Sequence, residues 1–143
     1  MAGLWVLLGT LVVAAAVGLG LRARNGRVRA PHPAETRPLP EAVTKVLDPA
    51  AAVTLVQIST TFCAPCRHTR VLLSSLAEKT GGLTHVDLDV TDQPEVAQAL
   101  SVLRTPTTLA MTPDGRELLR VGGVPRGEEL LDALRPHLGA TTP

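Results

Sequence analysis

Aromatic side chains are almost absent from this chain of 143 residues, which contains one tryptophan, one phenylalanine and no tyrosine. Trp5 lies near the N-terminus, so Phe62 is the only aromatic residue in the rest of the chain. A core built around large aromatic rings is therefore excluded. The interior of a folded domain must be built almost entirely from Leu, Val and Ala.

Cysteine is also scarce, because the chain has only Cys63 and Cys66. A small protein stabilised by a disulfide framework distributes several cysteines across its fold, and a disulfide that closes such a short loop adds almost no cross-linking stability. A disulfide framework is therefore excluded. The two thiols are expected to react or to bind a ligand.

The sequence also lacks the usual signs of a protein that binds nucleic acids or nucleotides. Its formal net charge is +1, and it has no basic face, glycine-rich phosphate loop or internal repeat. Nucleic acid is not expected as a partner. The length of the chain supports one folded domain.

What the chain does contain is a Cys-x-x-Cys motif soon after the apolar run Val53–Ser59. A cysteine at the N-terminus of a helix lies near unpaired backbone N–H groups and the positive end of the helix dipole, which favour its thiolate form. Pro65 fits the first turn of a helix, and Ala64 leaves the first thiol approachable. The spacing therefore predicts that Cys63 attacks a disulfide and that Cys66 resolves the mixed disulfide.

Metal or haem binding by the two cysteines is a weaker interpretation. Structural zinc normally takes four ligands from Cys and His, and the sequence has no second cysteine pair of this spacing. On a helix His68 lies roughly 140° around the axis from Cys63, so it is expected at the surface. A c-type haem attachment needs a histidine directly after the second cysteine, where Arg67 stands, and haem is therefore excluded.

The order of the expected elements predicts an α/β fold. Val53–Ser59 has the pattern of a buried strand, Leu83–Val90 that of a second strand, and the helix between them ends at Gly81, which makes one parallel βαβ unit. A short capped helix, two strands around a Pro-Asp-Gly turn and an amphipathic final helix follow. These later elements are expected at 91–100, 107–112, 117–121 and 128–138.

Several motifs together resemble the thioredoxin-like family over residues 53–138. Besides the Cys-x-x-Cys motif, Val102–Thr107 looks like the cis-proline loop that faces it, Pro113–Arg116 like the turn of the last hairpin, and Gly122–Gly123 like the glycine region beside the active site. The resemblance implies an α/β three-layer sandwich with a central mixed sheet. With its apolar N-terminal segment, the chain is similar to membrane-anchored thioredoxin-domain proteins of bacteria.

The resemblance also implies the chemistry of the site. Thioredoxin-like proteins exchange disulfides with protein substrates, without a metal and with no cofactor beyond their own reversible disulfide, here Cys63–Cys66. The family pattern implies a cis bond between Thr105 and Pro106, whose loop pairs with the substrate backbone. Substrate contacts are accordingly expected at Phe62, Ala64, Pro65, Thr105 and Pro106.

Two positions depart from the family pattern. Gln57 stands where relatives often keep a buried acid that moves a proton for the resolving thiol, and an amide cannot take that proton. Cys66 must then lose its proton to water or to another base, for which Asp87 is the one nearby candidate. The alternative for Asp87 is an ordinary solvated acid on a strand. Phe62 replaces the tryptophan of many thioredoxins and so lacks an N–H donor.

The N-terminal segment Gly3–Leu21 has no charged residue. As a helix it would span roughly 28 Å, close to the ~30 Å hydrocarbon core of a bilayer. It is predicted to be one transmembrane helix, which makes the chain a single-pass protein of the cell membrane. A cleaved signal peptide is the alternative, but it would have basic residues before a shorter apolar stretch and a small-x-small site after it, whereas Ala14–Ala16 lies inside the stretch.

Arginines follow this segment and none precedes it, at positions 22, 24, 27, 29 and 37. By the positive-inside rule, the thiol domain is expected on the cytoplasmic side. The extracytoplasmic side is the alternative, because tethered thioredoxin-like proteins of bacteria often face that way.

The predicted organisation has three parts: an anchor at 1–22, a linker rich in Arg and Pro at 23–48, and a thioredoxin-like domain at 49–143. The prolines of Ala30–Pro40 indicate an extended tether that gives the domain reach. Within the linker, Glu41–Leu47 fits either a first helix or a short strand.

The predicted function is that of a membrane-tethered thiol–disulfide oxidoreductase that reduces disulfides of protein substrates, while the oxidising direction follows the same path in reverse. Its electron donor would be a thioredoxin reductase or a membrane thiol transporter. The alternative is a copper-handling module that holds Cu(I) between the two thiolates, for which Met111 is a candidate third ligand.

Overall fold

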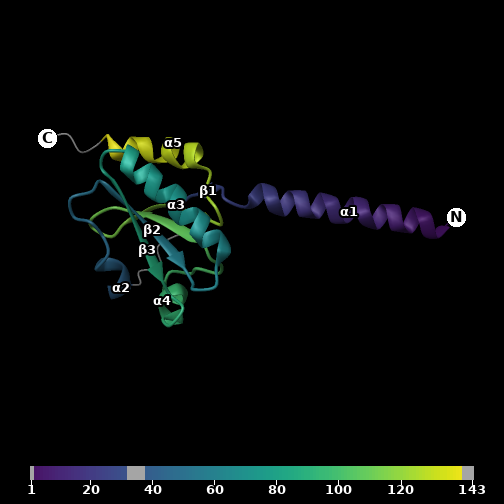
Figure 1. Ribbon diagram of the computed structural model, residues 1–143, viewed down its shortest axis with the longest axis horizontal. Coiled ribbons are helices and arrows are strands. Elements are labelled where there is room, and N and C mark those ends of the chain that lie inside the picture. Colours follow the sequence, from purple (N-terminus) through teal and green to yellow (C-terminus); the bar gives the residue numbers. More distant parts are fainter. Residues whose placement is uncertain (1, 32–37, 140–143) are drawn as a thin grey trace.

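The computed structural model describes residues 2–31 and 38–139. Helix α1 (Ala2–Arg24) projects from an α/β domain that contains the other described elements (Figure 1). None of the residues of α1 is buried. The domain therefore gives the apolar side chains of α1 no surface on which to pack.

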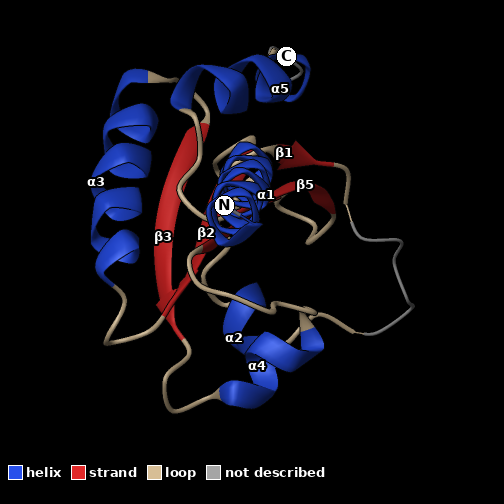
Figure 2. Cartoon of the chain, turned by 90° about the vertical axis from the view of Figure 1, so that its right-hand side faces the viewer, coloured by secondary structure: helices blue, strands red, loops and turns tan. Residues whose placement is uncertain are grey.

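A five-stranded mixed sheet forms the centre of the domain (Figure 2). Its strands are β1 (Val28–Arg29), β2 (Val53–Ser59), β3 (Leu83–Asp89), β4 (Thr107–Met111) and β5 (Glu117–Gly122). They are arranged in the order β1–β5–β4–β2–β3, in which β2 runs parallel to β3 and the other neighbours are antiparallel. The predicted βαβ unit and the predicted hairpin are both confirmed.

Helices cover both faces of the sheet and complete a three-layer sandwich. One face carries α3 (Ala64–Lys79) and α5 (Gly127–Leu138), and the other carries the short helices α2 (Glu41–Thr44) and α4 (Pro94–Ala99). The final helix α5 begins and ends close to its predicted bounds, because its leucines form one apolar stripe that packs on the sheet.

Strand β2 is buried on both faces, which explains why its sequence is a nearly continuous apolar run. Val53 and Leu55 belong to the core under α3 and α5, whereas Val56 and Ile58 belong to the core under α2 and α4. The alternation follows from the pleat of the strand. Among the described residues, no aromatic side chain is buried, so the core is the aliphatic one that the composition predicts.

The segment whose structure the sequence left open contains a helix. Within Glu41–Leu47, the single turn α2 follows Pro40, whose carbonyl accepts a hydrogen bond from the N–H of Val43 at 2.9 Å. The side chain of Val43 is completely buried against the core under this face of the sheet. The short strand is therefore excluded for this segment.

The sheet has an edge strand that the sequence analysis did not predict. Val28–Arg29 pairs antiparallel with Arg120–Val121 of β5, and two residues are too few to give a periodic hydrophobic signal. Because β1 and α2 both belong to the domain, the folded part includes residues before 49. The predicted tether Ala30–Pro40 follows a strand that belongs to the sheet, and its residues 32–37 lie outside the described part, so its extended conformation stays a prediction.

The junction between α1 and the domain is closely packed. The N–H of Gly26 donates to the carbonyl of Gly122 at 2.9 Å. Gly26 has a φ of +75°, and a Cβ there would overlap the carbonyl oxygen of Val124, so glycine is required. A Cβ on Gly123 would likewise overlap the side chain of Asn25. The C-terminal end of α1 is therefore joined to the end of β5 by a close-packed turn.

Candidate active site

The two cysteines lie where the loop after β2 enters α3. Cys63 is the N-cap residue of α3 and has extended backbone angles, and Pro65 lies in the first turn. The sulfurs of Cys63 and Cys66 form a disulfide bond. Cys66 is 2 % exposed, whereas Cys63 is half-buried. The sulfur that a partner molecule can reach is therefore that of Cys63, which fits the predicted order of attack and resolution.

The predicted proline loop lies against the segment that leads into the cysteines. The Thr105–Pro106 bond is cis, as predicted. Because β4 pairs with β2, the start of β4 and the end of β2 lie at one end of the sheet. The hydroxyl oxygens of Thr105 and Thr60 lie 3.4 Å apart, and the N–H of Gly123 donates to the carbonyl of Pro106 at 2.7 Å.

The residues around Cys63 form an exposed and mostly apolar rim. Phe62 is 98 % exposed, although it is the only aromatic side chain of the folded domain. Ala64 and Pro65 are also exposed. An apolar side chain left fully in water beside a reactive sulfur is a natural contact for another protein. Their role in substrate binding stays a prediction.

Gln57 lies directly beneath the second cysteine and is completely buried. Its amide nitrogen donates to the backbone carbonyl of Cys66 at 2.9 Å. Its amide oxygen lies 3.1 Å from Nε2 of His85. Both ends of the amide are therefore occupied, and Gln57 links the first turn of α3 to strand β3.

His85 is a residue of the site that the sequence analysis missed. Its Nδ1 lies 3.1 Å from the hydroxyl of Ser74 on α3. Since an amide oxygen only accepts hydrogen bonds, Nε2 of His85 must carry a proton toward Gln57. Burial lowers the pKa of His85, a nearby Asp87 raises it and Arg70 lowers it, with a net decrease. The neutral ring, which donates through Nε2 and accepts through Nδ1, is thereby favoured.

Asp87 is on β3 next to Gln57 but is bonded to other partners. Its two carboxylate oxygens accept hydrogen bonds from the Ser59 hydroxyl at 2.6 Å and from Nε of Arg70 at 2.7 Å. The Arg70 guanidinium also forms an ion pair with it. None of these described bonds reaches a cysteine, so the role of Asp87 in proton transfer stays a prediction.

Met111 does not lie near the two thiols. It pairs with Thr54 at the opposite end of β2 from the Cys-x-x-Cys loop and is 1 % exposed within the core. The proposal of Met111 as a third copper ligand is therefore wrong. Within residues 2–31 and 38–139, no cluster of three or more His, Cys, Asp or Glu side chains is arranged to hold a metal ion.

Two cysteines that pass between the dithiol and the disulfide state, with one sulfur reachable and the other covered, are the working part of a thiol–disulfide oxidoreductase. Residues 40–136 match the thioredoxin family. The chain belongs to the thioredoxin family, and it is a thiol–disulfide oxidoreductase.

Individual relatives come from plants and bacteria. The chain is 32 % identical to an H-type thioredoxin of Oryza sativa subsp. indica over 92 residues, which cover 64 % of this chain and 74 % of the rice protein. It is 31 % identical to a thioredoxin of Staphylococcus saprophyticus over 89 residues, which cover 62 % and 85 % of the two chains. The crystal structure of a thioredoxin from Nicotiana alata matches with a TM-score of 0.52 and 28 % identity, over 59 % of this chain and 72 % of that one.

Proposed function

We propose that this thioredoxin-family oxidoreductase is held in a membrane by α1 and reduces disulfides of protein substrates. The observation that carries the proposal is the unequal exposure of the two sulfurs: Cys63 is reachable beside an exposed rim, and Cys66 is 2 % exposed directly behind it. A thiol that starts the exchange must meet the substrate, and a thiol that finishes it must be protected from the solvent and from other disulfides.

The reductive cycle would have two exchange steps. In the first, the Cys63 thiolate attacks one sulfur of a substrate disulfide; a Cys63–substrate bond forms, the substrate bond breaks, and the leaving thiolate takes a proton. In the second, the Cys66 thiolate attacks Cys63, forms the Cys63–Cys66 disulfide and releases the other substrate sulfur. Two electrons pass to the substrate. A thioredoxin reductase or a membrane thiol transporter would restore the dithiol.

The substrate chain would lie between the apolar rim and the proline loop. Thr105 and Pro106 lie at the same end of the sheet as the cysteines. There the backbone of Thr105 can pair with an extended peptide in the manner of an added strand, with Pro106 contacting the peptide beside it. Phe62 would cover the apolar side chains of that peptide. Protein segments with an exposed disulfide are therefore the proposed substrates.

The membrane attachment rests on α1. The helix has 23 residues, a mean hydropathy of 2.3 over its most apolar window and no buried residue, and a helix of this length and composition can cross a bilayer. A signal sequence near an N-terminus has the same properties. The arginines after α1 favour a cytoplasmic position for the domain, and the extracytoplasmic position is the alternative.

The experiment that tests the oxidoreductase function is insulin-disulfide reduction by the full chain in detergent, with dithiothreitol as the terminal reductant. Cys63→Ser should abolish turnover, and Cys66→Ser should trap insulin as a mixed disulfide that is visible on a non-reducing gel. His68→Ser, an exposed change on the same helix, is the matched control and should leave turnover unchanged. Normal turnover by Cys63→Ser would overturn the proposed cycle.

A further inference from the structure

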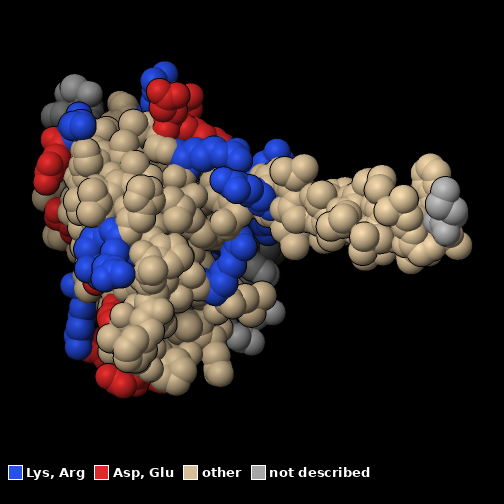
Figure 3. Space-filling model, turned by 45° about the vertical axis from the view of Figure 1, so that its right-hand side comes forward, with Lys and Arg blue, Asp and Glu red and all other residues tan. Residues whose placement is uncertain are grey.

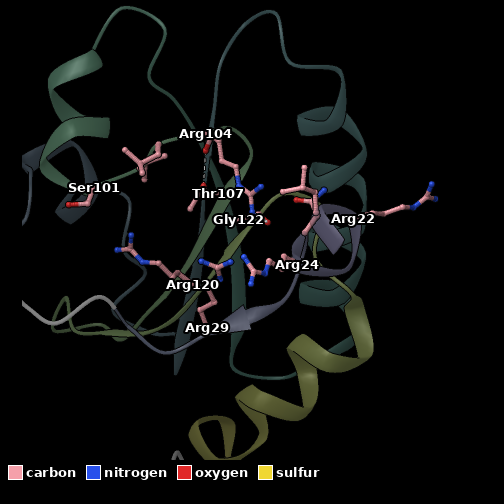
Figure 4. A pocket seen from close by; sticks show the side chains of 12 residues that line it. Arg22, Arg24, Arg29, Ser101, Arg104, Thr107, Arg120 and Gly122 are labelled. Carbon is pink, nitrogen blue, oxygen red and sulfur yellow. Dashed lines mark hydrogen bonds between the residues drawn. The ribbon is translucent and has the colours of Figure 1, made fainter. Parts of the chain in front are cut away.

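A pocket of about 940 Å³ lies where α1 meets the domain (Figure 4). The end of α1, strand β1, the segment 101–107 and strand β5 all contribute to its walls. Arginine is the dominant polar residue, with guanidinium groups from Arg22, Arg24, Arg29, Arg104 and Arg120. None of the described residues that line the pocket carries a carboxylate. The pocket is therefore strongly positive.

Arg120 belongs to the wall of the pocket and is not free to bind a ligand. Its Nε and Nη2 donate to the two carboxylate oxygens of Glu117 at 2.6 and 2.7 Å, and its Nη1 donates to the carbonyl of Leu100 at 3.2 Å. The Glu117 carboxylate neutralises its charge. The remaining positive charge of the pocket comes from the other arginines.

Arg104 is held against the sheet, and its remaining donors are available. Its Nη2 donates to the carbonyl of Gly122 at 2.9 Å. A Cβ on residue 122 would lie 2.9 Å from Nε and Nη2 of Arg104, so the glycine lets the guanidinium lie close to the strand. This one backbone bond fixes the group without neutralising its charge.

Arg24 and Arg29 point toward the centre of the pocket, whereas Arg22 points away from it (Figure 4). The side chains of Arg24 and Arg29 are exposed, as is that of Arg104. The same gathering of positive charge is visible at the base of the projecting helix in the space-filling view (Figure 3). Three guanidinium groups from three separate segments thus share one open space.

The pocket lies at the depth of lipid headgroups if α1 crosses a bilayer. The apolar part of α1 ends at Leu21, which also lines the pocket. Arg24 is three residues further on, about 4.5 Å along the axis. The headgroup layer on each side of the hydrocarbon core is roughly 5–7 Å thick. The hydrogen bond from Gly26 to Gly122 and the pairing of β1 with β5 hold the domain close to the end of α1.

We propose that this pocket binds the phosphate of one anionic phospholipid headgroup through Arg24, Arg29 and Arg104. Guanidinium groups present paired N–H donors that match phosphate oxygens. Leu103, which is 98 % exposed and also lines the pocket, would lie beside the acyl chains. A zwitterionic lipid would bring its ammonium group among the arginines, so the pocket selects a net negative lipid. This inference rests on the proposed membrane attachment.

The test is native mass spectrometry of the full chain in nonionic detergent, titrated with phosphatidylglycerol or with phosphatidylcholine of the same acyl chains. The chain should bind one phosphatidylglycerol at a concentration roughly tenfold lower than phosphatidylcholine, because the choline ammonium of the second lipid would lie among the guanidinium groups and oppose its binding. Arg24→Gln/Arg29→Gln/Arg104→Gln should lose this preference. Equal binding of the two lipids by the unmodified chain would overturn the proposal.

The control removes the same number of charges far from the pocket, in Lys79→Gln/Arg116→Gln/Arg135→Gln, and should keep the preference. If both triple variants lose it equally, overall charge and not the pocket binds the lipid, and the proposal fails. Arg24→Gln alone, which removes no described bond to the domain, keeps the test valid if the triple variant does not fold.

Two further comparisons show whether the pocket binds the phosphate of a lipid or free phosphate, and whether lipid binding depends on the thiol chemistry of the protein. Millimolar inorganic phosphate should not displace phosphatidylglycerol; displacement would make the pocket a site for free anions and overturn the lipid assignment. The mass measurement needs neither thiol chemistry nor a bilayer. A chain that selects phosphatidylglycerol but fails to reduce insulin would therefore reject the proposed reductive cycle alone, and the opposite pair of results would reject the pocket alone.

Discussion

The ring of His85 and the amide of Gln57 are joined by a hydrogen bond of 3.1 Å from Nε2 to the amide oxygen, under the turn that carries Cys66. The amide nitrogen of Gln57 at the same time holds the Cys66 carbonyl. A buried amide therefore occupies the position at which relatives often keep an acid, and it has a histidine as its neighbour. Neither of these hydrogen bonds involves the sulfur of Cys66, so the two side chains support the turn that carries this cysteine through its backbone.

Gln57→Asp should accelerate the decay of the mixed disulfide, because a carboxylate close to Cys66 can accept the proton of its thiol. The change removes the hydrogen bond to the Cys66 carbonyl and buries a carboxylate, so it should lower the free energy of unfolding by on the order of a few kcal/mol at neutral pH. Stopped-flow measurement of mixed-disulfide decay between about pH 6 and 9, a range that covers His and Cys titration, tests the rate. Gln57→Asn, which has no base, is the control and should give no acceleration.

Asp87→Asn tests the other candidate base. If Asp87 removes the proton of Cys66, this change should slow the decay of the mixed disulfide, and Gln57→Asp should then give no further acceleration. Arg70→Gln removes the ion-pair partner of Asp87 without removing the carboxylate and is the matched control. Unchanged decay in Asp87→Asn and Gln57→Asp alike would leave water as the base.

The stability of the domain should decrease as the pH falls through the titration range of His85. The pKa of His85 is lowered in the folded state by burial, so the unfolded chain binds a proton first, near pH 6.5. The contribution of the neutral His85 to the free energy of unfolding is therefore fully present above that pH. It is lost as the pH falls from about 6.5 toward the pKa of His85 in the folded state. Thermal melts between about pH 5 and 8 should show a smaller pH dependence for His85→Gln. His68→Gln, the same change at an exposed position, should not alter the dependence of the parent chain.

Leu73→Ala should lower the free energy of unfolding by about 2–5 kcal/mol, because it opens a cavity in the core. Leu73 is completely buried on α3 among Val53, Leu55 and Leu130. Val71→Ala lies on the same helix at a site that is 71 % exposed, and its effect should stay within about 0.5 kcal/mol. Urea unfolding of the two variants compares them, and equal losses would contradict the assignment of the core.

The side of the membrane can be tested with a single reporter thiol. In a Cys63→Ser/Cys66→Ser chain, Asp114→Cys places a thiol on the exposed turn of the β4–β5 hairpin. If the arginines after α1 fix the domain in the cytoplasm, a membrane-impermeant thiol reagent should label it only after lysis. Labelling in intact cells would place the domain on the extracytoplasmic side.

The parts of the fold that the sequence predicts well are those with long or strongly patterned segments. The run at β2, the helix after the Cys-x-x-Cys motif and the Pro-Asp-Gly turn each have a local cause, so their residues alone indicate the structure. Strand β1 has only two residues, and it exists because β5 offers an open edge. Its partner cannot be inferred from its own sequence.

The residues of the site also divide into those that a local sequence motif predicts and those that only the fold brings together. Cys63, Cys66 and Pro106 belong to motifs that are visible in the sequence, and the cis bond was expected from the resemblance to the thioredoxin-like family, since proline permits a cis bond without requiring it. The contact of His85 with Gln57 depends on the register of β3 against β2, in which Gln57 pairs with Asp87 and Leu55 with His85. His85 and Asp87 lie two residues apart on one face of β3, and this spacing gives no local sign of the register. The arginine pocket is assembled from three distant segments, and no single one of them predicts it.

The packing of Gly26 and Gly123 at the junction between α1 and the domain limits where the protein can meet other molecules. Gly26 is hydrogen-bonded to Gly122, and the next residue, Gly123, is hydrogen-bonded to Pro106 of the proline loop, so two backbone hydrogen bonds lead from the end of α1 to the end of the sheet where the cysteines lie. If α1 crosses a bilayer, the reactive sulfur travels at a nearly constant height above the lipid surface. Encounters then become a search in two dimensions, in which neighbours in the same membrane are present at a high effective concentration. Disulfides that lie far from the membrane surface would stay beyond the reach of Cys63.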